Sequence, residues 1–248
     1  MGGVVARAAL TLDSTDRIRK LIQLGAPNAG AFAPVQALRA VYPTVRKIAA
    51  LDHQHSAEEL ARKVFLSLPG LYQMLPSQQA GELDLFDVRS WPQDELTPNP
   101  MLLETAKAGR ARLVSADDRC MLIAGVAQET LTRVRVVDNQ FEYTVARDGD
   151  GTVPLALAHW PDARTWYVNE SHGSLTNNDA VLAAVVDLLK SDQTQRLTSD
   201  APARDYSIVR VTNDHELRQQ ATRKVTWDAL SLDTRRRILE PVISPEFL

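Results

Sequence analysis

Short hydrophobic runs alternate along this chain with longer stretches in which hydrophobic residues recur every three or four positions. Residues 20–25 and 120–125 are almost continuously hydrophobic, which is typical of parallel strands that are covered on both faces. Residues 165–168 form a third short run of this kind. Residues 2–10 are small and apolar, and they predict a helix that packs closely on a sheet. Together these patterns predict an α/β fold built on a parallel sheet.

Residues 178–190 predict the strongest amphipathic helix of the chain. Its hydrophobic positions share one face: Val181, Val185, Leu188 and Leu189. Either Asn178 or Asp179 can cap its first turn. Residues 140–145 are strand-like as well, and a glycine-rich acidic turn follows them.

The region 31–110 departs from the alternation of strands and helices. Residues 32–50 repeat hydrophobic side chains at helical spacing: Leu38, Val41, Val45 and Ile48. A second helix is predicted over 57–66, after a helix start at Ser56, and prolines punctuate residues 91–100. These features predict a helical insertion, which in a hydrolase commonly forms a lid over the site.

The patterns divide the chain into a core, an insertion and an extension. The predicted parts are the α/β core at 1–30 and 111–194, the helical lid or cap insertion at 31–110, and a C-terminal extension at 195–248. Inside the extension, residues 206–211 alternate like an exposed strand and residues 229–239 look like a short helix. We therefore expect the C-terminal part of the chain to be an appended tail.

Composition limits the class of protein. At 248 residues, with 44% hydrophobic and 24% charged residues, the chain can bury a sizeable core. The net charge of −3 does not indicate a surface that binds nucleic acid, and the basic run at 235–237 is interpreted as part of a surface helix.

No hydrophobic run approaches the roughly 18 residues of a membrane span, and no signal peptide is visible, so we expect a cytoplasmic protein. Cys120, the single cysteine, excludes an intramolecular disulfide and lies in a predicted buried strand.

Two loops that follow predicted strands carry residues suited to nucleophilic catalysis. Asp150 lies in Asp-Gly-Asp-Gly-Thr-Val-Pro at 148–154, and His172 lies in Ser-His-Gly-Ser-Leu at 171–175. A serine hydrolase needs a base that takes the proton of the nucleophile and a buried carboxylate that orients this base. In α/β hydrolases the acid precedes the histidine along the chain, as it does here. The 22 positions between the two residues leave room for a helix or loop and one strand, so both are expected to leave adjacent strands.

Other interpretations of these residues stay open. The acidic loop can be an ordinary Asp-Gly turn or a calcium loop, although position 152 is a threonine and no glutamate closes an EF-hand near 159. No metal site is therefore predicted, and His172 has the alternative role of a structural capping residue. The other histidines lie where a solvated or packing role is the ordinary explanation: His53, His55, His159 and His215.

Four segments occur in an order that resembles a known family. They are Leu-Gly-Ala-Pro-Asn-Ala-Gly at 24–30, Pro-Gly-Leu-Tyr-Gln-Met-Leu-Pro at 69–76, and the loops at 148–154 and 171–175. Over residues 1–190 the chain resembles the lecithin:cholesterol acyltransferase-like branch of the α/β-hydrolase lipases. The resemblance implies that the chain forms the C-terminal part of an α/β-hydrolase parallel sheet, with a helical lid insertion. The resemblance implies an acyl-enzyme mechanism on an ester or lipid substrate, with no metal or organic cofactor. In it a serine attacks the ester, His172 shuttles the proton, Asp150 orients His172, and the acyl group passes to water or an acceptor alcohol.

The first residues, Met1-Gly2-Gly3, resemble the residues that follow the nucleophile in the G-x-S-x-G turn of these enzymes. No G-x-S-x-G occurs in the 248 residues. The serine is therefore expected one position before Met1, on an upstream or separately encoded chain. The backbone N–H of Met1 is then implied to be one oxyanion donor. The chain as given is expected to be truncated, inactive by itself and poorly soluble because of an exposed sheet edge.

An alternative hypothesis belongs to another class of protein. The hydrolase scaffold can be kept by a non-catalytic protein that uses it as a binding or assembly module. Coding sequence for Gly-x-Ser directly before Met1 would favour the enzyme, and a stop codon there would favour the module.

Overall fold

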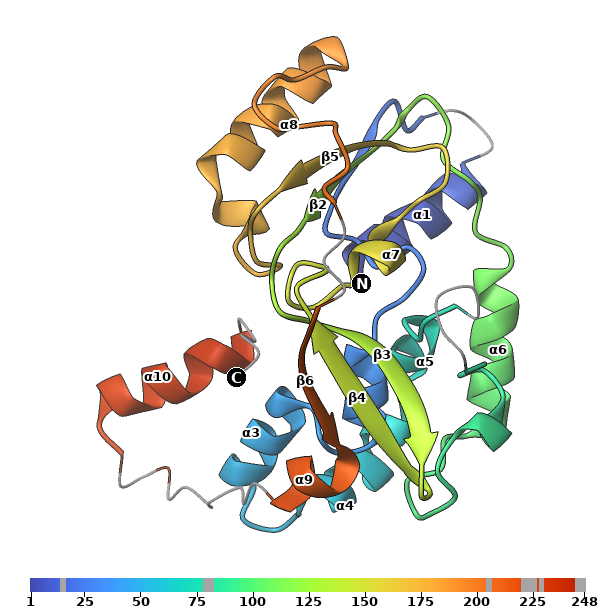
Figure 1. Cartoon of the computed structure of the whole chain (residues 1–248), viewed down its shortest axis with the longest axis vertical. Helices are drawn as coiled ribbons and strands as arrows, with labels where there is room; N and C mark the ends of the chain where they lie inside the picture. The colour runs from blue at the N-terminus through green and yellow to red at the C-terminus, as the bar shows by residue number, and fades with distance from the viewer. Residues whose placement is uncertain (14–16, 78–82, 204–206, 220–226, 228–229, 244–248) are drawn as a thin grey trace.

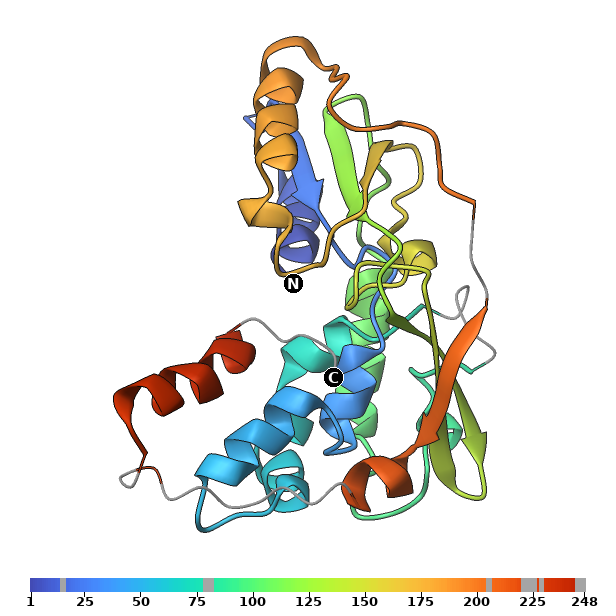
Figure 2. The same ribbon diagram turned by 60° about the vertical axis from the view of Figure 1, so that its left-hand side comes forward.

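The computed structural model describes residues 1–13, 17–77, 83–203, 207–219, 227 and 230–243. Within these residues the fold is mixed α/β, with one parallel and one antiparallel three-stranded sheet (Figure 1). The parallel sheet lies in the upper half of Figures 1 and 2, with the helices α1 (Gly2–Leu12), α7 (Leu155–Ala158) and α8 (Asp179–Ser191). The antiparallel sheet and the helices of the insertion form the lower half. The predicted α/β class with a parallel sheet is confirmed.

The central strand of the parallel sheet is β2 (Cys120–Gly125), between β1 (Leu21–Leu24) and β5 (Arg164–Val168). All six residues of β2 are buried, which explains its continuous hydrophobicity. Met121 packs in a cluster with hydrophobic residues of α8, whereas its neighbour Cys120 packs in a cluster with Leu10 of α1. Because successive side chains of a strand point to opposite faces, α8 covers one face of the sheet and α1 the other.

Both ends of α8 are held by side chains. Asn178 caps the start, since its side-chain oxygen accepts hydrogen bonds from two backbone N–H groups of the first turn, as predicted. At the other end, Lys20 donates to two carbonyls of the last turn and lies 2.8 Å from the Asp192 carboxylate. A cation at a helix C-terminus is favourable. Because Lys20 directly precedes β1, these contacts connect the end of α8 to the start of that strand.

The antiparallel sheet consists of β3 (Thr130–Val137), β4 (Gln140–Ala146) and β6 (Ile208–Asn213), with β4 in the middle. The strand predicted at 140–145 is present, but it belongs to this separate sheet and not to the parallel series. Asp138 and Asn139 turn the hairpin with φ of 49° and 57°, a conformation that these residue types tolerate. β3 was not expected, because polar and arginine side chains interrupt its hydrophobic pattern.

The insertion is helical, as predicted. Its elements are α2 (Ala33–Leu38), α3 (Pro43–Leu51), α4 (Ala57–Lys63), η1 (Phe65–Ser67), α5 (Pro69–Gln73), η3 (Val88–Ser90) and α6 (Pro100–Arg110). The single helical stretch expected at 32–50 is two helices, because Ala40 has a φ of 62° and Pro43 starts a new helix. Ser56 and Glu59 form a capping box at the predicted start of α4.

The C-terminal extension is built into the fold and is not simply appended. β6 pairs with β4 along its length, and α9 (Asp214–Gln219) follows it. The buried carboxylate of Asp214 accepts hydrogen bonds from Arg39, the C-cap residue of α2, at 3.0 Å and from the Tyr143 hydroxyl of β4 at 2.5 Å. Arg39 also forms a bidentate pair with Asp94 at 2.7 Å. This network joins the insertion, the hairpin and the extension.

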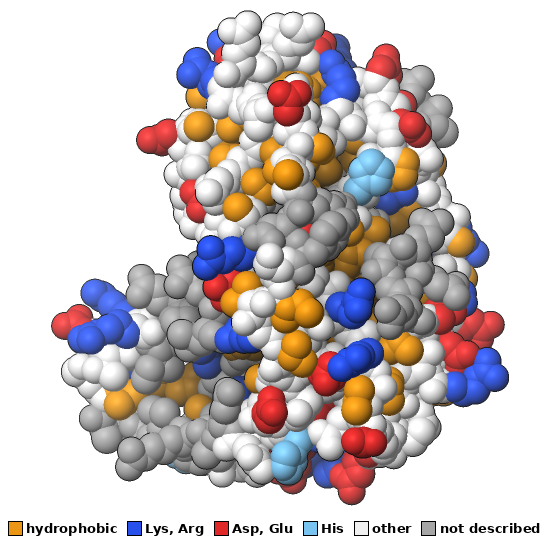
Figure 3. Space-filling model, in the orientation of Figure 1, with side chains coloured by type: hydrophobic (Ala, Val, Ile, Leu, Met, Phe, Trp, Pro, Cys, Tyr) orange, Lys and Arg blue, Asp and Glu red, His pale blue; other side chains and the backbone are white. Residues whose placement is uncertain are grey.

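A last helix, α10 (Leu232–Ile243), overlaps the helix predicted at 229–239. Residues 206 and 229, where the predicted strand and helix of the extension begin, lie outside the described residues. On the face shown in Figure 3, acidic and basic side chains are interspersed with small groups of hydrophobic ones. Across the described part of the chain, no helix has both the length and the apolar character needed to cross a membrane.

Candidate active site

The structure brings Asp150 and His172 together in one contact. His172 Nδ1 lies 2.6 Å from Asp150 Oδ2, although the residues are 22 positions apart. The backbone N–H of His172 also donates to the carbonyl of Asp150 at 2.7 Å. Two hydrogen bonds therefore fix the histidine loop to the acidic loop.

The path of the chain to this contact differs from the expected one. Asp150 does not leave a strand of the parallel sheet, because the β3–β4 hairpin intervenes between β2 and the acidic loop. The loop nevertheless returns to the end of β2: a β-carbon on Gly125 would lie 2.6 Å from the Asp150 β-carbon. His172 follows β5, the neighbour of β2. Both side chains therefore lie at the carboxyl ends of adjacent parallel strands, the edge where α/β sheets commonly hold their sites.

The acidic loop holds the Asp150 carboxylate in one orientation. Oδ1 accepts hydrogen bonds from the backbone N–H groups of Thr152 at 2.9 Å and Val153 at 2.6 Å. Gly151 supplies the φ of +89° that the turn requires, and its N–H donates to the Thr130 hydroxyl at 2.9 Å. Asp150 is 2% exposed. Oδ2 is left for the histidine, so the carboxylate can set the tautomer of the ring.

His172 presents the opposite nitrogen for chemistry. When Nδ1 donates to the carboxylate, the lone pair of the neutral ring is on Nε2, which can accept a proton. Within the described residues, Nε2 has no hydrogen-bond partner, and the side chain is 35% exposed. A buried carboxylate, an oriented imidazole and an accessible Nε2 are the requirements of a general base.

Two glycines make this arrangement possible. A β-carbon on Gly25, at the end of β1, would lie 2.8 Å from Asp150 Oδ2 and 3.0 Å from His172 Nδ1. A β-carbon on Gly125, at the end of β2, would lie 2.5 Å from the carbonyl oxygen of Glu170. The sequence marks both as strand ends, but it does not show that they lie against the acid and the base.

Met1, the predicted oxyanion donor, lies at the N-cap of α1. Its side chain is 52% exposed, and its methyl group would lie 2.8 Å from a β-carbon on Gly70 of α5. The start of α1 and the insertion therefore meet at this point. No contact given by the described residues joins Met1 to Asp150 or His172, so its oxyanion role stays a prediction.

The other histidines have different surroundings. His55 Nδ1 lies 2.8 Å from Asp52, and hydrogen bonds from the Gln54 N–H and from the side chain and N–H of His55 lower the pKa of that carboxyl to about 2. His215 contacts Gln219 within α9, and His53 is exposed. The described residues hold no cluster of three His, Cys, Asp or Glu side chains suited to a metal ion, the acidic loop included.

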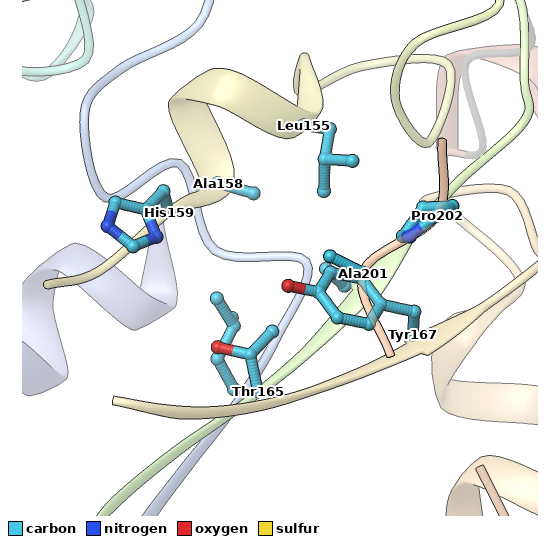
Figure 4. A pocket seen from close by; sticks show the side chains of 9 residues that line it. Leu155, Ala158, His159, Thr165, Tyr167, Ala201 and Pro202 are labelled. Carbon is cyan, nitrogen blue, oxygen red and sulfur yellow. The ribbon is translucent and has the colours of Figure 1, made fainter. Parts of the chain in front are cut away.

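His159 borders a small hollow beside the parallel sheet (Figure 4). The hollow has a volume of about 100 Å³, and Thr165 and Tyr167 of β5 place their hydroxyl groups toward it. Leu155 and Ala158 of α7 form its apolar side. Neither Asp150 nor His172 lines it, so it is separate from the acid–histidine pair.

Comparison with known proteins identifies no relative: no protein-family model, no curated protein and no solved structure matches this chain.

Proposed function

We propose that the chain carries the acid and base of a serine-dependent lipid ester hydrolase or O-acyltransferase. The observation that carries this proposal is the 2.6 Å contact of the buried Asp150 carboxylate with His172 Nδ1, on a side chain that is 35% exposed and whose Nε2 has no hydrogen-bond partner among the described residues. In the proposed reaction, His172 Nε2 takes the proton of a serine hydroxyl as the serine attacks the ester carbonyl. Asp150 holds the ring and stabilises the imidazolium that forms.

His172 then passes on the proton that it took from the serine, and the acyl group is afterwards released in a second half-reaction. His172 gives its proton to the alkoxide leaving group, and an acyl-enzyme remains. Water or an acceptor alcohol then loses a proton to His172 and attacks the acyl carbonyl. The bond between the acyl group and the serine oxygen breaks, and His172 gives its proton to this oxygen, which restores the free serine. No step calls for a metal ion or an organic cofactor.

Two further observations support an apolar ester as the substrate. The helical insertion reaches the start of α1, where Met1 contacts Gly70. Beside Gly70, Leu68 and Val64 expose 41% and 43% of their surface, and Met1 exposes 52%. Exposed apolar side chains at the junction of core and insertion suit an acyl chain, because its burial there is favourable. The resemblance of the four sequence motifs to lipases of the α/β-hydrolase type points to the same class.

The proposal requires a serine that the 248 residues do not present in a G-x-S-x-G turn. Its place in the proposal is directly before Met1, so that the N–H of Met1 faces the developing oxyanion. The experiment therefore assays p-nitrophenyl ester hydrolysis by the chain expressed together with any coding sequence that reads into Met1 in frame.

We expect such an extended chain to hydrolyse the esters and the 248-residue chain to show at most residual activity. His172→Ala should lower kcat by roughly 10⁴-fold or more. Full activity of His172→Ala would refute the assignment of the base. A stop codon directly before Met1, together with an inactive protein, would favour the non-catalytic binding module.

A further inference from the structure

We propose that Glu170 is the positioning residue for His172, an inference that rests on the hydrolase function proposed above. Glu170 precedes the histidine by two residues, in the loop 169–178 that joins β5 to α8 and includes the short 3₁₀ helix η4 (Leu175–Asn177). Its side chain ties the beginning of this loop to its end.

Both oxygens of the Glu170 carboxylate accept hydrogen bonds from residues of the loop. Oε1 accepts a hydrogen bond from the backbone N–H of Ser171 at 2.8 Å, with the Ser171 hydroxyl at 3.4 Å. Oε2 accepts one from Asn178 Nδ2 at 3.0 Å. Asn178 is the N-cap of α8, so one carboxylate connects the residue before His172 with the first turn of a helix that packs one face on the parallel sheet.

The backbone of Glu170 is fixed as well. Its carbonyl oxygen packs against Gly125 at the end of β2, and its N–H donates to the carbonyl of Val168 at 2.9 Å. On the near side of the loop, Gln128 Nε2 donates to Asn169 Oδ1 at 2.7 Å. Glu170 is therefore the point at which the sheet, the histidine loop and α8 are joined, and its side chain supplies the connection to α8.

The chemistry of these contacts distinguishes Glu170 from a surface charge. No Lys or Arg pairs with it in the part of the chain that the structure describes, so the carboxylate does not serve an ion pair. The hydrogen bond from Asn178 Nδ2, and secondly that from the Ser171 N–H, hold the pKa of the Glu170 carboxyl below its usual value of 4.5. The side chain is thus a charged acceptor at neutral pH, and its bonds to the loop are charge-assisted.

The consequence concerns the imidazole of His172. A short Asp–His hydrogen bond requires the ring to stay within a few tenths of an ångström of its partner. Asp150 is fixed by its own loop. Apart from the two hydrogen bonds between His172 and Asp150, the position of the histidine loop depends on how its two ends are held at β2 and α8. Releasing the Asn178 end of this loop should let His172 move away from Asp150 while the fold is kept.

The test is proton NMR of the 248-residue chain labelled with ¹⁵N-histidine, which contains only five histidines. A short Asp–His bond gives a far-downfield Hδ1 resonance, and Asp150→Asn assigns it by removing it. Glu170→Gln keeps the shape of the side chain but replaces one acceptor oxygen by an amide. We expect Hδ1 of His172 to exchange with water about tenfold faster in this variant, or to broaden beyond detection.

A second variant acts on the partner and spares the helix. Asn178→Asp keeps the cap oxygen for α8 but replaces the Nδ2 donor by an oxygen that repels Glu170. At neutral pH this variant should also make Hδ1 of His172 exchange faster with water or broaden. Thr176→Ser, an exposed position of the same loop, is the matched control and should leave the resonance unchanged.

The outcomes separate this inference from the proposed function. If Hδ1 of His172 is unchanged in both Glu170→Gln and Asn178→Asp while both variants remain folded, the positioning role is wrong. If the unaltered chain lacks the downfield resonance that Asp150→Asn should remove, the Asp–His pair and the hydrolase proposal lose their support as well.

Discussion

Gly25 lies against the Asp150 carboxylate so closely that a β-carbon at this position would be 2.8 Å from Oδ2. The same β-carbon would be 3.0 Å from His172 Nδ1. The end of β1 therefore lies directly against the hydrogen bond between Asp150 and His172, and only glycine leaves room for it.

Gly25→Ala should destabilise the fold and break this hydrogen bond. The backbone at Gly25 has a φ of +57°, where alanine costs about 1–2 kcal/mol, and the added methyl group overpacks the site by about 1–3 kcal/mol. We expect the free energy of unfolding, measured by urea denaturation, to fall by about 2–5 kcal/mol, the sum of these two costs. Gly109→Ala is the control: a β-carbon there meets nothing within 4 Å, and the helical position should tolerate or favour alanine. Equal stability of the two variants would contradict the close packing.

Asp150→Asn should lower catalytic activity and leave the fold intact. An amide at position 150 can keep the acceptor contact with the backbone of the acidic loop but favours the wrong tautomer of His172. In the extended chain, kcat should fall on the order of 10⁴-fold, with little change in the far-UV circular dichroism spectrum. A loss of less than tenfold would show that Asp150 is a turn residue and not the orienting acid.

Removal of the Asp214 carboxylate should weaken the joint between the insertion, the hairpin and the extension. The side chains of Arg39 and Asp214 are 1% and 0% exposed, so among the described residues Asp214→Asn leaves this buried guanidinium with Asp94 as its one acidic partner. We expect a loss of about 3–5 kcal/mol in the free energy of unfolding. Tyr143→Phe, which removes one hydrogen bond to a charged group, should cost about 1.5–3 kcal/mol.

A double-mutant cycle tests whether these residues act as one network. The effects of Asp214→Asn and Tyr143→Phe should be less than additive, because Tyr143→Phe removes the 2.5 Å hydrogen bond and Asp214→Asn takes away the charge that strengthens it. Burial, and secondly the charge of Asp214, raises the pKa of the Tyr143 hydroxyl well above its usual value, so it remains a donor in alkaline solution. Strictly additive losses would mean that the contact contributes nothing to stability.

The stability of the chain should depend on pH partly through Glu170. Its pKa in the folded chain is lowered by Asn178 and Ser171, so the folded state binds this proton less readily than the unfolded state does. The contribution of Glu170 is therefore present above about pH 4.5 and is lost as the pH falls through the lower folded value. In urea denaturation between pH 3 and 7, the free energy of unfolding should therefore fall less steeply toward acid pH in Glu170→Gln than in the unaltered chain. The same pH dependence of the free energy of unfolding in both proteins would show that the hydrogen bonds of this carboxylate do not favour folding.

Cys120 should react with thiol reagents only when the chain unfolds. Its side chain is fully buried at the start of the central strand, and burial raises the pKa of the thiol. The rate of reaction with a disulfide reagent should therefore rise in parallel with the unfolded fraction in urea. Rapid reaction in native buffer would contradict the burial of β2, and Cys120→Ala should leave the His172 resonance unchanged.

Much of the local structure follows from the sequence. The continuous hydrophobicity of β2 predicts a strand buried on both faces, because a parallel strand meets covering layers on each side. The cap at Asn178 and the capping box at Ser56 are local interactions between neighbours in the chain, so they can be read from residue type and spacing. The order of Asp150 and His172 likewise singles out the pair, because a triad needs these two side-chain types.

Contacts between distant segments could not be predicted in this way. β3 carries polar residues at many positions because one side of a three-stranded antiparallel sheet can face water, and its pairing with β4 decides that it is a strand. The extension reads as a tail, because the burial of Asp214 depends on Arg39, which is 175 positions away. The break between α2 and α3 depends on the positive φ of Ala40, a residue with no turn preference.

The sequence by itself determined which side chains are capable of acid–base chemistry and which segments are strands or helices of the parallel core. Residue type and short-range spacing are sufficient for these properties. Only the tertiary structure decided that Asp150 and His172 lie 2.6 Å apart, that Gly25 and Gly125 leave room for them, and that Glu170 fastens the histidine loop to α8. These are distances between segments that meet only when the sheet has formed, so no local pattern in the chain specifies them.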